Sequence, residues 1–158
     1  MEAHIGIKSE HLSEVAKSLS QVLSDEFVLY TKTRNAHWNV EGKDFHDMHE
    51  FFEEQYEQLD ETMDAVAERI RMLGHYAPGT LKGFLSLTHL TEATREKNDS
   101  IGLITELLKD HESIIKVLRT EINRFATELH DLGSSDFATG LMETHEKMAW
   151  QLRAHLVR

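Results

Sequence analysis

Apolar positions recur every three or four residues along most of the chain, which is the spacing of one face of an α-helix. The clearest run keeps this spacing at Ile101, Ile104, Leu108, His111, Ile115, Leu118, Ile122, Phe125, Leu129 and Leu132. Such a run is typical of the seam of a helical bundle. We therefore predict a long helix from about Thr94 to Leu132, which Gly133 ends.

The same spacing predicts a first helix from about Ser9 to His37, with Ser9 as its N-cap. A second helix runs from Phe45 to about Leu73, and Asp44 can cap it. A single proline in the whole chain suits long, unbroken helices.

A short helical piece is expected at about Thr80 to Leu87. A last helix is capped by Ser134 or Ser135 and places Trp150 in the core. Two pairs of long helices with a longer middle connection describe an all-α four-helix bundle with one crossover, in which the short piece is an extra helix.

The chain is long enough for one domain with a real core. We assign residues 1–8 to an N-terminal tail and residues 9–158 to the bundle.

One stripe of the second helix carries metal-type side chains, namely His49, Glu53, Asp64 and Glu68. Asp64 and Glu68 are four residues apart and share a face. His49 and Asp64, however, are separated by roughly 22 Å along a helix that rises about 1.5 Å per residue. Ligands must lie about 2.0–2.6 Å from their metal ion. If these residues bind one metal, two copies of the chain must supply them.

An intrachain di-iron centre needs Glu-x-x-His on two helices, and no histidine here follows a glutamate at that spacing. His37 and His49 can instead converge across the short turn between the first two helices. A second copy related by a two-fold axis would bring its Asp64 and Glu68 to them. The alternative interpretation is a solvated helix face with no ligand role.

The net charge and the amino-acid composition exclude several classes of function. The chain has 17 basic and 28 acidic residues, a net charge of −11 and no cysteine. The charge attracts cations and repels nucleic acid, and the absence of cysteine excludes disulfides and thiolate sites. No stretch approaches a membrane span, and the N-terminal segment lacks the blocks of a signal peptide. We expect a cytoplasmic protein.

Paired motifs then point to a family. Residues 35–42, NAHWNVEG, followed by residues 45–50, FHDMHE, resemble the signature of the Dps family, the mini-ferritins of starved bacteria. Residues 64–70, DAVAERI, look like the family's second motif. The resemblance continues through PGTL at 78–81 and HEKMAW at 145–150, so it covers nearly the whole chain beyond the tail.

The resemblance implies a ferritin-like bundle assembled as a hollow dodecamer. It also implies a ferroxidase centre in which His37 and His49 of one subunit meet Asp64 and Glu68 of the two-fold mate, with two irons per site. Glu53 stands where many members have Asp, one turn after the second histidine, and is a further candidate ligand.

Three further side chains near the predicted centre are less clearly tied to iron chemistry. Trp38 could accept oxidising equivalents beside the centre or plug the interface. His46 occupies a position that varies in the family, and Tyr56 is expected to pack.

The implied activity is oxidation of Fe(II), with hydrogen peroxide as the oxidant, and storage of the ferric mineral, which protects against oxidative damage. Iron entry is expected at three-fold pores near the junction of the last two helices, where Glu128, Asp131 and Asp136 could concentrate cations.

Members that bind DNA directly often use a lysine-rich tail, but this tail offers only Lys8 before the first helix, beside Glu2 and Glu10, and the C-terminus ends at Arg158. We expect no tight DNA binding. Other interpretations of the sequence are a non-enzymatic protective or nucleoid-associated shell, a maxi-ferritin type of store, and a plain helical interaction protein.

Overall fold

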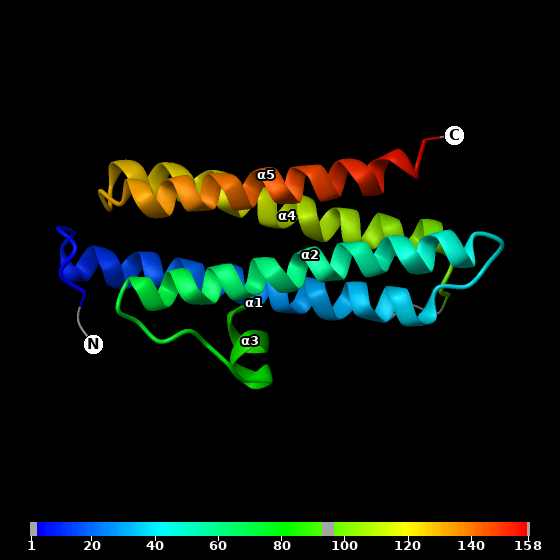
Figure 1. Ribbon diagram of the computed structural model, residues 1–158, viewed down its shortest axis with the longest axis horizontal. Helices are drawn as coiled ribbons and strands as arrows, with labels where there is room; N and C mark the ends of the chain where they lie inside the picture. Colours follow the sequence, from blue (N-terminus) through cyan, green and yellow to red (C-terminus); the bar gives the residue numbers. More distant parts are fainter. Residues whose placement is uncertain (1–2, 93–96, 158) are drawn as a thin grey trace.

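The computed structural model describes residues 3–92 and 97–157. Its long helices form two antiparallel hairpins that pack together as a four-helix bundle (Figure 1). The helices of the first hairpin are α1 (Ser9–Asn39) and α2 (Phe45–Met72), and those of the second are α4 (Ser100–Thr127) and α5 (Leu132–Ala154). The described residues contain no β-strand, so the predicted all-α fold is confirmed. None of their helices is long and apolar enough to cross a membrane.

The crossover from α2 to α4 contains the short helix α3 (Leu81–Leu87), which packs against α1 on the side away from the second hairpin (Figure 1). The buried carboxylate of Asp25 on α1 holds the segment that follows α3. It accepts hydrogen bonds from the Thr88 hydroxyl at 2.7 Å and from the backbone N–H of His89 at 2.6 Å. The predicted extra helix is therefore present, and the segment after it is tied to α1 by a buried carboxyl group.

The beginning of α4 differs from the prediction. Asp99 is the N-cap, and its side chain accepts a hydrogen bond from the backbone N–H of Gly102 at 2.8 Å, so α4 starts six residues after Thr94. The predicted residues 94–96 lie outside the described part of the chain. Ile101, which we placed in the seam, is 54% exposed.

The turn between α4 and α5 comes earlier than predicted. His130 has a left-handed backbone with φ 56°, which few residues adopt and which a helix cannot continue through. Asp131 then caps α5 by accepting a hydrogen bond from the backbone N–H of Ser134 at 2.9 Å. The prediction that Ser134 or Ser135 is the cap is wrong, and Leu132 lies on the surface instead of in the seam.

Two other side-chain predictions are wrong. Lys8, not Ser9, holds the N-cap position of α1. Trp150 is 61% exposed, while its neighbours Met148 and Ala149 carry the buried face of α5.

A chain of buried polar groups crosses the apolar core and links the two hairpins. Glu26 of α1, His145 of α5 and His111 of α4 are all at most 1% exposed. His145 Nε2 lies 2.6 Å from Glu26 Oε1, and His145 Nδ1 lies 2.9 Å from His111 Nδ1. The Glu26 carboxylate oxygen accepts from His145 Nε2, and one of the two facing Nδ1 atoms donates to the other.

The environment of His111 makes its charged form unfavourable. Burial and then the nearness of His145 hold the pKa of His111 well below its ordinary value of 6.5. The folded protein therefore keeps His111 neutral at a pH at which the unfolded chain protonates it.

We expect acid to weaken the fold through His111. Its contribution to stability is fully present above about pH 6.5 and is lost as the pH falls from there toward the lower folded-state pKa. His111→Gln keeps an N–H donor but cannot titrate, so it should flatten the pH dependence of the free energy of unfolding by up to about 1.4 kcal/mol per pH unit. Urea unfolding between about pH 7.5 and about pH 5 measures this slope. The exposed His46→Gln is the control, and an unaltered slope in His111→Gln contradicts the assignment.

Candidate metal centre

His37 and His49 lie together where α1 ends and α2 begins. Their rings stack with centroids 3.8 Å apart and an interplanar angle of 22°. His37 Nδ1 lies 2.8 Å from the backbone carbonyl oxygen of His49, and His49 Nδ1 lies 2.8 Å from that of His37. The two residues thus hold each other in a reciprocal pair.

This pairing fixes the tautomer of both rings. A carbonyl oxygen only accepts, so each Nδ1 must carry a hydrogen and donate it. In a neutral imidazole the other nitrogen, Nε2, then keeps its lone pair. Metal-binding histidines usually donate their second nitrogen to an oxygen in this manner. Nε2 is therefore the nitrogen through which each side chain could bind a metal ion.

The turn between α1 and α2 makes this geometry possible. Gly42 has φ 138°, a backbone conformation that favours glycine. The N–H of Glu41 donates to the carbonyl of Asn98 at 3.0 Å instead of continuing α1. The carbonyl of His37 therefore lacks its usual partner at the helix end, and His49 supplies one.

Glu53 and Tyr56 lie one and two turns further along α2, and both are half-buried. The Tyr56 hydroxyl donates to Glu53 Oε1 at 3.0 Å, and the Tyr56 ring meets the His37 ring edge-on at 5.3 Å. Burial, followed by the hydrogen bond to Glu53, raises the pKa of Tyr56, so the phenol stays protonated and remains a donor. Spacing alone suggested packing for Tyr56 and missed this bond, although the i, i+3 separation from Glu53 places the two side chains on one face.

Trp38 points away from the bundle core and is 63% exposed. The guanidinium of Arg34 lies 5.3 Å from its ring and 4.3 Å from the ring of Tyr56, which links Trp38 to the surroundings of the histidines. Trp38 also lines a groove of about 500 Å³ between α1 and α3, together with the exposed Leu81 and Leu85. Exposed apolar side chains gathered in this way are typical of an interaction surface.

Asp64 and Glu68 are exposed and remote from the histidines. Since α2 runs without a break from Phe45 to Met72, the separation of roughly 22 Å along its axis holds in the structure. Across residues 3–92 and 97–157, no three His, Asp or Glu side chains of one chain gather as a metal site. A complete ligand set of the predicted kind therefore requires a second copy. His46 is exposed and lies 3.6 Å from Glu50.

The three acids expected at the pore differ in their surroundings. Glu128 and Asp136 are exposed. Asp131 is 2% exposed, caps α5 and pairs with Arg69 of α2 at 3.4 Å. A buried, paired carboxylate has little charge to offer a passing cation, so Glu128 and Asp136 are the better candidates.

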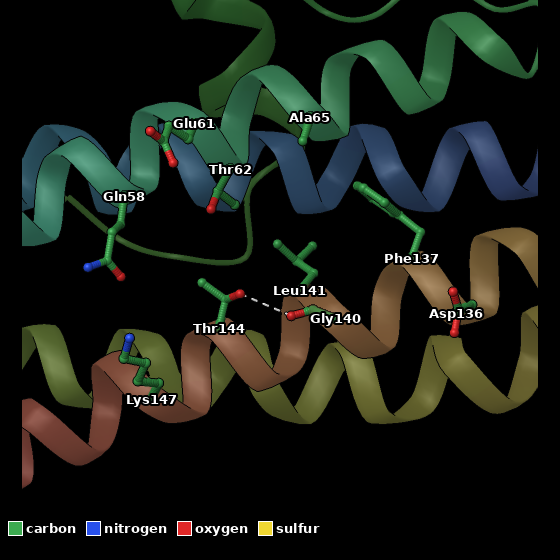
Figure 2. A pocket seen from close by; sticks show the side chains of 10 residues that line it. All are labelled: Gln58, Glu61, Thr62, Ala65, Asp136, Phe137, Gly140, Leu141, Thr144 and Lys147. Atoms are coloured by element: carbon green, nitrogen blue, oxygen red, sulfur yellow. Dashed lines mark hydrogen bonds between the residues drawn. The ribbon is translucent and has the colours of Figure 1, made fainter.

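A groove of about 670 Å³ separates α2 from α5 and has Asp136 at one end and Lys147 at the other (Figure 2). Glu61 lies on the α2 wall, while Thr144 turns its hydroxyl to the carbonyl of Gly140 at 3.0 Å. Its acidic and basic groups are spread apart, so the groove has no concentrated set of ligands. The histidine pair remains the strongest candidate centre.

Comparison with known proteins identifies the family. Residues 16–158 match the family described as ferritin-like domain. A DNA protection during starvation protein of Helicobacter pylori is 34% identical over 138 residues, which cover 87% of this chain and 95% of the relative. An uncharacterized low temperature-induced protein of Nostoc sp. is 42% identical, with coverage of 97% and 86%.

The structures agree. The crystal structure of a Dps protein from Vibrio cholerae, described as a member of a broad superfamily of ferritin-like diiron-carboxylate proteins, superimposes with a TM-score of 0.92. It is 28% identical, and the match covers 99% of this chain and 97% of that one. Sequence and fold together show that the chain belongs to the Dps family of ferritin-like proteins.

Proposed function

We propose that this protein is an iron-storing ferroxidase. It oxidises Fe(II), with hydrogen peroxide as the oxidant, at sites between two-fold related subunits, and it keeps the ferric product inside a hollow homo-dodecamer. His37 and His49 of one subunit bind the iron together with Asp64 and Glu68 of a second copy. Two irons occupy each site, and Glu53 is an additional ligand.

The observation that carries this proposal is the reciprocal histidine pair. Two Nε2 lone pairs are fixed at the end of the first hairpin, while two exposed acids lie further along the same helix. Imidazole and carboxylate together suit iron. The superfamily named for the Vibrio cholerae relative is one of diiron-carboxylate proteins, which supports the same chemistry here.

The reaction balances for a pair of irons. Each Fe(II) gives one electron to hydrogen peroxide, whose O–O bond breaks, and hydrolysis yields ferric oxyhydroxide: 2 Fe²⁺ + H₂O₂ + 2 H₂O → 2 FeO(OH) + 4 H⁺. Carboxylates favour the more highly charged Fe(III) over Fe(II). Because the two irons of one site together supply both electrons that peroxide accepts, no hydroxyl radical is released. In this way the protein protects against oxidative damage.

Loss of one ligand tests the activity. After anaerobic loading with Fe(II) and addition of limiting peroxide, we expect fast oxidation, a soluble ferric product and little trapped hydroxyl radical. Glu68→Ala should slow oxidation by at least about 10-fold, because it removes a group that holds iron at the site. Absorbance and spin trapping measure both quantities, and the exposed Glu57→Ala is the control. Wild-type oxidation no faster than that of free iron would instead favour a non-enzymatic protective shell.

Mixed assemblies test whether the site is shared between subunits. His37→Ala/His49→Ala chains and Asp64→Ala/Glu68→Ala chains should each be inactive alone. When they co-assemble, some interfaces combine intact histidines with intact acids, so part of the activity should return. The oxidation rate after mixing denatured and refolded chains measures this recovery, and mass spectrometry verifies that both chains are present. Mixed shells with no activity argue for a site within one chain.

Two substitutions distinguish an effect on iron entry from an effect on the stability of the fold. Asp136→Asn removes an exposed charge and should slow iron uptake severalfold with stability unchanged, because focused negative potential raises the local concentration of cations. Asp131→Asn can still cap α5 but should lower the melting temperature, since it removes the buried carboxylate that pairs with Arg69. Stopped-flow uptake and thermal unfolding distinguish the two effects. Equal uptake by wild type and Asp136→Asn counts against the pore.

Tight DNA binding is not part of the proposed function. The net charge is −11, and Lys8 is the only Lys or Arg before α1, whereas phosphate contacts supply most non-specific affinity. We place the protein in the cytoplasm, because a chain without cysteine suits a reducing compartment.

A further inference from the structure

Glu53 lies one turn after His49 and has a longer side chain than the aspartate it replaces in the family pattern, and one neighbour restrains it. The Tyr56 hydroxyl donates to Glu53 Oε1 at 3.0 Å. This bond uses one lone pair of Oε1, so Oε2 is the oxygen that has both lone pairs open to a metal ion.

Tyr56 is itself held in place from several sides. The guanidinium of Arg34 lies over its ring at 4.3 Å, and the ring of His37 meets it edge-on at 5.3 Å. The ring of Tyr30 packs against it at 6.1 Å with an interplanar angle of 86°. A half-buried phenol enclosed by a cation and two rings has little freedom to turn.

We propose that Tyr56 is a positioning residue of the metal centre, which holds Glu53 so that its carboxylate binds iron through Oε2 alone. This inference rests on the proposed function and adds to it the mode of binding of the ligand that departs from the family pattern. Tyr56 does not touch the metal, and its effect passes through Glu53.

The physical reason is the freedom of a glutamate side chain. Glutamate has one more rotatable bond than aspartate, and ordering a long side chain costs free energy at the moment of binding. A hydrogen bond made before the metal arrives removes much of that cost. Groups that orient a ligand in this way typically change metal affinity by about 10- to 100-fold.

The test uses anaerobic binding of Co(II) to the assembled protein, because Co(II) is not oxidised and its visible spectrum reports the ligands. Tyr56→Phe deletes the hydroxyl but keeps the ring and its contact with Arg34. We expect Co(II) affinity to fall about 10-fold. In the zinc-loaded Tyr56→Phe protein, the infrared carboxylate bands of Glu53 should shift from the pattern of a carboxylate bound through one oxygen toward that of one bound through two.

Two variants separate positioning from a general structural effect. Tyr76→Phe makes the same chemical deletion on an exposed ring in the loop after α2, outside the surroundings of Glu53, so affinity should stay unchanged. In a Glu53→Asp background the carboxylate is too short to keep the Tyr56 bond. There, Tyr56→Phe should have no additional effect.

The outcomes are distinct. Equal affinity in Tyr56→Phe and wild type overturns the positioning role, and so does an equal loss of affinity from Tyr56→Phe with and without the Glu53→Asp substitution. If the double variant His37→Ala/His49→Ala loses Co(II) binding, the proposed centre is supported. If that double variant still binds Co(II) normally, the proposed centre fails, independently of Tyr56.

Discussion

The reciprocal hydrogen bonds between His37 and His49 join the end of α1 to the start of α2, and the candidate centre depends on them. Each imidazole is oriented by the backbone of the other residue, so neither ring can turn without breaking a bond that the other helix needs. The helix-end carbonyl of His37 gains a partner at the same time. One pair of contacts therefore closes the hairpin, fixes both tautomers and leaves two nitrogens ready to bind.

Docking of the two hairpins places this centre on a stable framework. The core is apolar, yet Glu26, His145 and His111 form a polar chain through it. Each of these three residues has a partner, but Glu26 Oε2 is buried without one, so the chain has little to spare if another contact is lost, because an unpaired buried group is costly. Further polar contacts between the hairpins lie near the ends, where Arg124 of α4 pairs with Glu14 of α1 at 2.8 Å. These directional contacts set the register of one hairpin against the other, which apolar packing alone defines less sharply.

Much of the architecture follows from the sequence, because helical spacing and turn residues are local signals. The four long helices, the short helix in the crossover and the approach of His37 to His49 were all readable from spacing. The start of α4 and the turn before α5 were not, since apolar spacing continues through Leu129 and Leu132 although His130 leaves the helix. Spacing also does not distinguish Asp99 and Asp131 from other polar residues that can cap a helix. Trp150 and Ile101 were misplaced because helical spacing does not tell which apolar face meets the core and which meets solvent or another subunit.

The short turn between α1 and α2 acquires an unusual constraint from the histidine pair. Loops generally accept insertions and deletions, and this one is largely exposed. The histidine pair holds the last turn of α1 against the first turn of α2, so the loop must bring the backbones of His37 and His49 within reach of each other's rings. A deletion that makes the loop too short to do so would pull the two rings apart, whereas an added residue can bulge into solvent. The minimum length of this surface loop is therefore fixed by the geometry of two side chains.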